Sequence, residues 1–333
     1  MKESNSKLNL TPWQVTGLVD GEGAFTVSKS GHTIKLELKV TQKVNSDGIL
    51  YGLTSFFKCG SVVIDNRKTD TKKFRVSALK DILTIIIPHF EKYPCLTSKF
   101  LNYQDWKKIA IKISKKEHLT SKGLTEINLI MENMNKKRSF EDKFNHCKNY
   151  FSFLSSPQRG QMSEGRFFSQ KPNELMFKLS PEWVQAFISG EGTFYNYLAK
   201  SKSISKGKTY TFQRCDSSLE IGQNSHDVWV LLAIKNFFGG GYIKPKYNYN
   251  DVMECKNSRS LNRFVFRDTA AIIKFVDEHP MLTRKQIDYL NWKKVVELKN
   301  AGAHKTVEGL TLIEKIIYDS RLALHAKSPT QMK

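Results

Sequence analysis

Two glutamates stand in matching sequence contexts and together could bind a metal ion for hydrolytic chemistry. Glu22 and Glu191 are each flanked by two glycines. The segments around them, 10–25 and 179–194, share Leu, Pro, Gly, Glu, Gly and Phe at an offset of 169 residues. A single Gly-Glu-Gly after a helix is usually a C-cap with a surface acid. Two copies in register instead predict two half-sites that act together.

The residues before each acid have helical spacing. Gly17 and Gly21 are four residues apart, as are Ala186 and Gly190, so each expected helix carries a stripe of small residues. Two such stripes let the helices pack closely and bring both carboxylates to one point, where they repel each other unless a cation lies between them. A hard divalent ion, foremost Mg²⁺, suits oxygen ligands. It would activate a water for phosphodiester hydrolysis, and the free carbonyls of Gly21 and Gly190 could add ligands.

A second repeated signature extends the duplication along the chain. Residues 93–108 and 279–294 share eight residues at an offset of 186. The change of offset from 169 to 186 predicts a net insertion of 17 residues in the second copy, around 199–208 and 247–260. Two copies are too few for a solenoid, so the repeat predicts two halves packed face to face.

The repeat also predicts the domain boundaries. We expect an N-terminal half over residues 8–140, a linker over 141–172 and a C-terminal half over 173–333. The linker contains SSPQRGQMSEGRFFSQKP, whose Ser, Pro, Gly and Gln content is typical of a connecting segment.

Within each half the pattern predicts a helix, two strands, a helix, two strands and further helices. Thr11 and Ser180 are good helix N-caps, each followed by a proline. Residues 24–30 and 33–42 alternate in polarity, which predicts strands with one buried and one solvated face. Residues 98–113 form an amphipathic helical pattern. The polar sheet face could read a nucleic-acid groove, although an ordinary solvated sheet shows the same alternation.

Composition favours a polyanionic partner. The 333 residues fit about two domains, and 53 Lys and Arg against 32 Asp and Glu give a net charge of +21. A basic protein without a specific nucleic-acid site would share this charge, but the duplicated acids make that alternative less favoured.

Other site classes are disfavoured. The five cysteines contain no CxxC pair, which argues against a structural zinc or a disulfide framework and favours a reducing compartment. The longest apolar run, 82–87, contains Thr84 and stops at Pro88, so we expect no membrane span. The first residues, MKESNSK, lack the apolar segment of a secretory signal.

Four further polar residues repeat near the expected site. Gln42 and Gln223 end matching strands, and Lys99 and Lys285 match within the second signature. Near a metal, the glutamines could position a water or a phosphate oxygen, and the lysines could stabilise charge on the transferring phosphate. Taken alone, each glutamine is better explained as a strand-end cap and each lysine as a solvated residue at a helix N-terminus.

At these residues the chain resembles the single-chain LAGLIDADG homing endonucleases, in particular the intron-encoded type of fungal mitochondria. Residues 16–23, TGLVDGEG, and 186–192, AFISGEG, match the family motif, and the second signature extends the resemblance over nearly the whole chain.

The resemblance implies an α+β fold of two pseudo-symmetric αββαββα halves, whose saddle-shaped antiparallel sheets bind the DNA major groove. It implies a monomer, made from an organelle gene in the mitochondrion, that cleaves a long double-stranded DNA target across the minor groove and leaves 3′ overhangs. It also implies dependence on Mg²⁺, with Mn²⁺ or Ca²⁺ able to occupy the same site and Ca²⁺ not expected to support turnover.

The resemblance further implies roles for individual residues. The last acid of each motif, Glu22 and Glu191, would bind the metal, and the matched Gln and Lys residues would support catalysis. In the first half, DNA contact is implied for Ala24, Thr26, Ser28, Ser30, Lys35, Glu37, Lys39, Thr41, Arg75 and Ser77. In the second half, it is expected for Thr193, Tyr195, Tyr197, Arg214, Glu220, Tyr242, Lys244, Lys246, Arg263 and Arg267.

Two positions depart from the pattern. Ser189 replaces the first acid of the motif, which Asp20 retains, and a capping role is expected there rather than a metal ligand. Gly222 stands where the first half has Thr41, which leaves the register of the second strand open.

Three functions therefore stand side by side. The chain could be an endonuclease that promotes intron mobility, an RNA maturase that assists splicing of a group I intron, or a catalytically silent DNA-binding module. A basic surface does not separate RNA from DNA. The presence of both glutamates favours cleavage.

Overall fold

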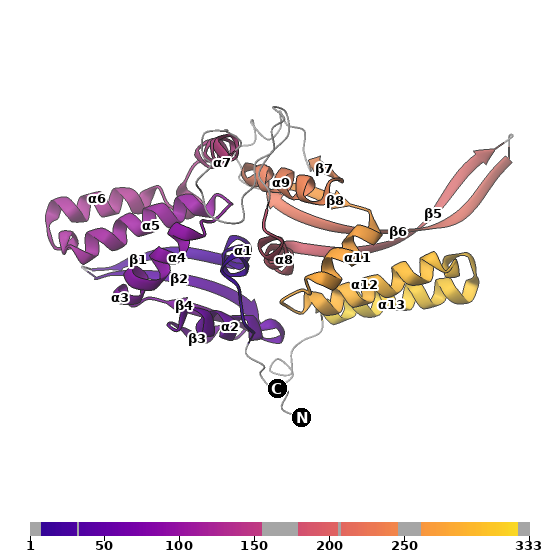
Figure 1. The fold of residues 1–333 in the computed structure, drawn as a ribbon, viewed down its shortest axis with the longest axis horizontal. Coiled ribbons are helices and arrows are strands. Elements are labelled where there is room, and N and C mark those ends of the chain that lie inside the picture. Colours follow the sequence, from indigo (N-terminus) through magenta and orange to yellow (C-terminus); the bar gives the residue numbers. More distant parts are fainter. Residues whose placement is uncertain (1–7, 32, 155–178, 206–207, 246–260, 326–333) are drawn as a thin grey trace, which may run out of the picture.

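The computed structural model describes two similar halves, each built on a four-stranded antiparallel sheet (Figure 1). The described residues are 8–31, 33–154, 179–205, 208–245 and 261–325. The strand orders are β1-β2-β4-β3 and β5-β6-β8-β7, the same path in both halves. This arrangement confirms the expected α+β fold with a repeated αββαββ core.

The elements of the first half follow the predicted order. They are α1 (Pro12–Glu22), β1 (Gly23–Ser30), β2 (Thr33–Lys43), η1 (Val44–Ser46), α2 (Gly48–Phe57), β3 (Ser61–Asn66), β4 (Thr71–Val76), α3 (Leu79–Asp81), the π-helical turn η2 (Ile82–Ile86), α4 (Ile87–Lys92), α5 (Lys99–Ser114), η3 (Glu117–Leu119), α6 (Ser121–Glu132), η4 (Asn135–Lys137) and α7 (Phe140–Leu154).

The second half repeats this order. Its elements are α8 (Pro181–Glu191), β5 (Gly192–Ser205), β6 (Lys208–Asn224), η5 (Ser225–Asp227), α9 (Val228–Phe238), β7 (Tyr242–Pro245), β8 (Leu261–Phe266), α11 (Thr269–Glu278), α12 (Lys285–Asn300), η6 (Ala303–Lys305) and α13 (Val307–His325). In the described part of the chain, no helix has the length and apolarity that crossing a membrane requires.

Both motif helices begin where their caps predict. The Thr11 side chain accepts a hydrogen bond from the Gln14 backbone N–H, and the Gln14 side chain accepts one from the Thr11 backbone in return. Ser180 accepts from the backbone N–H of Trp183. These bonds satisfy donors that the first helical turn leaves unpaired.

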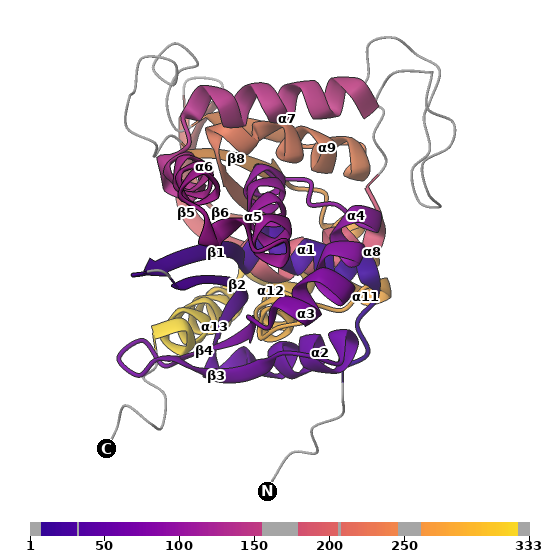
Figure 2. The ribbon, with the colours of Figure 1, turned by 90° about the vertical axis from the view of Figure 1, so that its left-hand side faces the viewer.

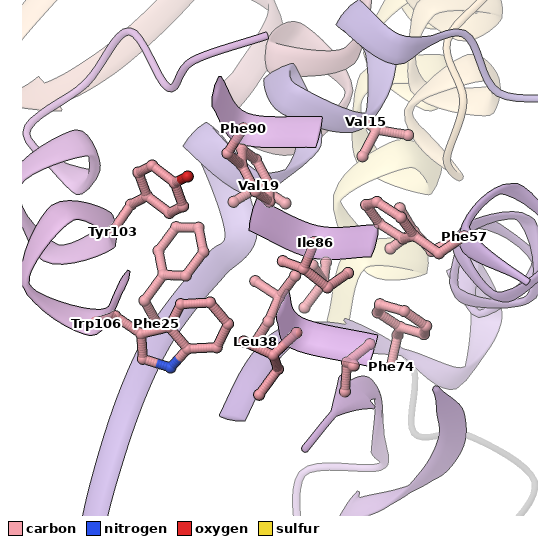
Figure 3. Close-up of a cluster of buried hydrophobic side chains, with 14 of the residues drawn as sticks. Val15, Val19, Phe25, Leu38, Phe57, Phe74, Ile86, Phe90, Tyr103 and Trp106 are labelled. Carbon is pink, nitrogen blue, oxygen red and sulfur yellow. The ribbon is translucent and has the colours of Figure 1, made fainter. Parts of the chain in front are cut away.

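Each sheet has one face buried under its helices. In the first half, Phe25 of β1 lies against Tyr103 and Trp106 of α5, with ring centroids 5.4 Å away in both pairs (Figure 3). Tyr289 and Trp292 of α12 occupy the matching buried positions in the second half. The repeated aromatic residues of the second signature are therefore core residues.

Helices α1 and α8 pack against each other between the two sheets (Figures 1 and 2). Gly17 marks their closest approach, because a Cβ there would lie 2.5 Å from the Trp183 carbonyl oxygen and 2.9 Å from the Ala186 Cβ. Across the same interface, Gln14 Nε2 donates to Gln185 Oε1 over 2.7 Å. The stripe of small residues predicted from the sequence thus lies at the contact between the halves.

The insertion of the second half lengthens its first hairpin. Strands β5 and β6 have 14 and 17 residues, whereas β1 and β2 have 8 and 11. This confirms the insertion expected around 199–208. The one expected around 247–260 lies outside the described residues.

The segment expected to be a linker begins as a helix. Most of α7 falls within 141–172, and it lies over α9 of the second half (Figure 2). Phe144 contacts the Trp229 ring at 6.1 Å, and Cys147 Sγ donates to Asp227 Oδ1 over 3.3 Å. Phe140, Phe144 and Cys147 have helical spacing, a signal that the polar composition of 155–172 obscured. Residues 155–178 lie outside the described part.

Replacing Gly17 should loosen the contact between the halves. Gly17→Ala forces a methyl group against the backbone of α8, so the free energy of unfolding should fall by about 1–3 kcal/mol. Urea unfolding followed by circular dichroism measures it. Gly48→Ala is the control, because a Cβ there meets nothing within 4 Å. Equal stability of both variants would contradict the proposed close packing.

Candidate active site

The two motif acids lie at the paired ends of α1 and α8. Each helix ends at its glutamate, and each glutamate packs on a glycine of the other helix. A Cβ on Gly190 would lie 3.2 Å from Glu22 Cγ, and one on Gly21 would lie 3.6 Å from Glu191 Cγ. Glycine before each acid therefore leaves room for the opposite carboxylate, and the structure brings the two together.

The two carboxyl groups influence each other. Burial raises the pKa of Glu191 above its ordinary value of 4.5, and the neighbouring Glu22 raises it further. Lys99, Lys285 and a hydrogen bond from Gln223 act in the opposite direction but do not outweigh these causes. Ionising both acids is therefore costly unless positive charge is added between them.

Lys99 and Lys285 both reach this pair of acids. Lys99 Nζ donates to three carbonyl oxygens at the end of α1, at 3.0, 2.7 and 2.6 Å for Val19, Asp20 and Gly21. Burial lowers the pKa of the Lys99 ammonium, against the attraction of nearby acids. Burial likewise lowers the pKa of Lys285, against Asp288, Glu22 and Glu191. The second signature thus supplies the cations that face the acids of the first.

The two repeated glutamines occupy equivalent strand positions. β1 and β2 start pairing at Gly23↔Val40, and β5 and β6 at Gly192↔Ile221, so Gln42 matches Gln223 and the open register of β6 is settled. Gln223 bonds to the Glu191 carboxyl. Gln42 Nε2 is buried and has no hydrogen-bond partner among the described residues.

The position of the first motif acid, Asp20 in one half and Ser189 in the other, caps a turn in both halves. Buried Asp20 accepts bonds from the backbone N–H groups of Leu96 and Thr97 at 2.8 and 3.1 Å, and from Trp183 Nε1 at 2.9 Å. Ser189 Oγ accepts from the Leu282 N–H at 2.9 Å. These turns lead directly into α5 and α12, which begin with the two lysines, so this position orients the lysines.

Sequence reasoning missed a second pair of contacts between the halves. Asp227 of η5 accepts from the Ser98 N–H and hydroxyl at 2.7 and 3.0 Å. At the equivalent place, Ser46 Oγ accepts from the Arg284 N–H at 3.2 Å. One half uses Asp and the other Ser, so no identity between the repeats marked them.

A cavity of about 660 Å³ opens beside the acids. Glu191, Gln223 and Lys99 line it together with lysines from η4 and α7 that the sequence did not single out, namely Lys136, Lys137 and Lys143. The second half contributes Asn224, His226 and Asp227. The cavity therefore brings Glu191 of the second half next to lysines of the first half.

The paired acids fit a hard divalent cation. Among the described residues no group of three or more His, Cys, Asp and Glu side chains could hold a metal. Mg²⁺ needs no such cage, since it commonly takes one or two carboxylates and completes its shell with waters and substrate phosphates. The Gly21 carbonyl already accepts from Lys99 and keeps a second lone pair.

In the first half, the residues expected to contact DNA share the open face of the sheet. Their register pairs are Ala24↔Lys39, Thr26↔Glu37, Ser28↔Lys35, Ser30↔Thr33, Lys39↔Arg75 and Thr41↔Lys73. Ser77 follows β4 and is exposed. Lys73, which sequence reasoning omitted, lies in the same row and forms ion pairs with Glu37 at 3.4 Å and Asp65 at 3.3 Å.

In the second half, the expected residues again share one face. Thr193 pairs with Glu220, and the Tyr195 and Tyr197 rings stack with centroids 6.3 Å apart. Other contacts on this face are Arg263 with Glu220 at 2.9 Å, Arg214 with Asp216 at 2.8 Å, Arg267 over the Tyr242 ring at 5.7 Å, and Lys244 in register with Arg263. Lys246 lies outside the described residues.

Equivalent positions on the two sheets carry opposite charges. Because the two hairpins share a register, Lys39 corresponds to Glu220 and Lys35 corresponds to Asp216. The sheets are thus alike in backbone but different in the groups they present.

Removing one acid should ease the ionisation of the other. In metal-free protein, Glu22→Gln should lower the pKa of Glu191 towards 4.5, though burial keeps it raised. Titration of ¹³C-labelled carboxyl carbons by NMR measures this. An unchanged pKa would show that the two groups do not interact.

The raised pKa of Glu191 also makes the stability of the protein depend on pH. Above pH 4.5 the unfolded chain loses the Glu191 proton before the folded protein does, so folded protein binds more protons and loses stability as pH rises. Between pH 4.5 and the raised pKa of Glu191 in the folded protein, the wild-type free energy of unfolding should therefore fall relative to that of Glu191→Gln. Parallel pH curves from urea unfolding would contradict the raised pKa.

Comparison with known proteins gives a consistent picture. Residues 15–110 and 186–296 match the family model of the LAGLIDADG endonucleases. Probable intron-encoded endonuclease 3 of Neurospora crassa is 28% identical over 322 residues, which are 94% of this chain and 55% of that protein. Probable intron-encoded endonuclease 2 of the same fungus is 26% identical over 311 residues, 91% of this chain and 64% of that protein. The chain thus spans less than two thirds of either relative.

Solved structures agree in fold. The meganuclease I-SmaMI bound to uncleaveable DNA matches with a TM-score of 0.70 at 25% identity, covering 93% of this chain and 97% of that one. I-SmaMI bound to an uncleaved DNA target in the presence of calcium ions matches with a TM-score of 0.68. The matched segments contain both repeats, both acids and both sheets, and the chain belongs to the LAGLIDADG endonuclease family.

Proposed function

We propose that this chain is a site-specific endonuclease that hydrolyses both strands of a long duplex DNA target and leaves 3′ overhangs. One observation carries the proposal: two glutamates from equivalent helix ends meet at the interface of two sheets with polar open faces. Each strand of a duplex would then meet one half of the protein and one of the two acids.

The chemistry assigned to the site follows from its charges. Glu22 and Glu191 would hold the divalent cation, with Gly21 and Gly190 as carbonyl ligands and Mg²⁺ as the physiological ion. Such a cation would polarise the scissile phosphate and lower the pKa of the attacking water. I-SmaMI binds an uncleaved DNA target in the presence of calcium ions, which supports a reaction that depends on a divalent ion.

The supporting residues have distinct tasks in this proposal. Lys285, whose pKa burial lowers, lies near both acids and would stabilise charge on the phosphate. Lys99 would hold the end of α1 in place through its three carbonyl bonds. Gln223 would orient the Glu191 carboxylate, and Gln42 Nε2, which has no partner among the described residues, would bind a water or a phosphate oxygen.

The biological setting follows from the relatives. Both Neurospora proteins are described as probable intron-encoded endonucleases, which supports an intron gene, a role in intron mobility and a mitochondrial location for this chain. The repeat supplies both half-sites in one chain, so a monomer suffices. An RNA maturase or a silent DNA-binding module would not need two opposed carboxylates, which favours cleavage.

Replacing either acid should stop cleavage without preventing binding. Glu22→Gln and Glu191→Gln each remove a charge that the metal needs, so double-strand cleavage should fall by more than about 10²- to 10³-fold. A randomised duplex library with Mg²⁺, sequenced at its cut ends, identifies the target and measures the rate. Glu132→Gln at the exposed end of α6 is the matched control. Wild-type cutting of both strands by either acid variant would refute the metal assignment.

The charge difference between the sheets should appear in the target. A carboxylate accepts from the cytosine amino group and a lysine donates to guanine, so Glu220→Lys should change the preferred base at one position. The expected discrimination is about 10- to 100-fold, equivalent to about 1–3 kcal/mol. Binding selection from a library compares the variants, and preferences in the half-site of the first sheet should stay unchanged. A target preference identical to wild type would exclude a base contact by Glu220.

A further inference from the structure

The first hairpins of the two halves differ in length. Strands β1 and β2 pair as far as Ser30↔Thr33, and the equivalent pair of the second half is Ala199↔Arg214. Beyond it, β5 and β6 continue for six more pairs, to Ser205↔Lys208. We call these strand segments, 200–205 and 208–213, the hairpin arm.

The arm reaches past the helices of its own half. Figure 1 shows β5 and β6 extending beyond the ends of α12 and α13, in the direction opposite to the β1–β2 hairpin. Six residues of strand rise about 20 Å. Since base pairs stack about 3.4 Å apart, that length matches about six base pairs.

The composition of the arm suits a polyanion. The strand segments 200–205 and 208–213 contain three lysines, with no Asp or Glu. Lys200 and Lys202 are exposed. A two-stranded ribbon is the width that the major groove admits, and such a ribbon is only marginally stable alone in water. Duplex DNA would supply the negative charge that the lysines attract and a surface against which the ribbon can pack.

We infer that the hairpin arm binds duplex DNA outside the reach of the first half, so that the half-site of the second half is about six base pairs longer. The inference rests on the proposed function and adds to it an unequal footprint. The first half, whose hairpin ends at Ser30↔Thr33, sets the shorter side.

Shortened duplexes test the inference. Wild-type protein in metal-free buffer is titrated by fluorescence anisotropy with its target trimmed in two-base-pair steps from either end. Affinity should begin to fall about six base pairs farther from the cleavage point on the second-half side. Equal distances on both sides would overturn the inference.

A deletion variant makes the halves equal. Removing 200–205 and 208–213 leaves residues 206–207 between Ala199 and Arg214. This connection has the same length as the two residues between Ser30 and Thr33. An even deletion in each strand preserves which residues face which side. The variant should show equal trimming distances on both sides while still cutting at the centre. If the deletion variant still needed a longer duplex on the second-half side, the inference would be overturned.

A substitution variant does not depend on the folding of the shortened hairpin. Lys200→Gln/Lys202→Gln should make the slope of log affinity against log salt less steep by about 2, since each phosphate contact contributes about 0.9. Lys115→Gln/Lys122→Gln makes the same charge change at exposed positions of the helical layer and should leave the slope unchanged. Equal slopes for wild type and the arm variant would contradict contact by the arm.

The readouts separate the two proposals. If wild-type protein cuts at a central site and the trimming distances are equal, the endonuclease function is retained and DNA contact by the hairpin arm is refuted. A protein that cuts no duplex in the library removes both.

Discussion

The close contact of α1 with α8 is the constraint on which the rest of the structure depends. Gly17 lets the α1 backbone approach the Trp183 carbonyl, and Gly21 and Gly190 then leave room for the opposite glutamate. Any larger residue at the crossing would separate the helix ends and with them the acids. The sheets follow, because β1 and β5 start at Gly23 and Gly192, one residue after each acid. One interface therefore sets both the site and the spacing of the two open faces.

The electrostatics of the site depend on residues that hold the helix ends and the turns beside them. Asp20 caps the turn that begins α5, and Lys99 at its start returns to the carbonyls of α1. Ser189 caps the corresponding turn before α12. Since a carboxylate and a hydroxyl can both accept from a backbone N–H, the motif tolerates either residue here. In the proposed metal site Glu22 and Glu191 would have no such freedom, because a carboxylate combines negative charge with hard oxygen ligands.

Much of this could be predicted from the sequence, because duplication converts weak signals into strong ones. Glu22 with Glu191, Lys99 with Lys285 and the strand alternation were each visible as repeats. Helix α7, Lys73, and the Asp227 and Ser46 contacts were not, since they have no matching partner or replace one polar group by another. The pairing of β6 was open at Gly222 and required the observed register. What the sequence lacked was the information on side-chain contacts across the interface, which only the packing of the halves decides.

The two halves are alike around the acids and differ on the open faces of their sheets. The motif helices, lysines and glutamines occupy equivalent positions in the two halves, as the proposed reaction at two like phosphodiesters would require. The open faces have no such requirement, since base edges differ from position to position. Lys39 and Glu220 occupy one position with opposite charges, and the β5–β6 hairpin extends six pairs beyond its counterpart. The two halves therefore keep their acids at equivalent helix ends while their open faces present different groups, a combination that the proposed recognition of two unlike half-sites would use.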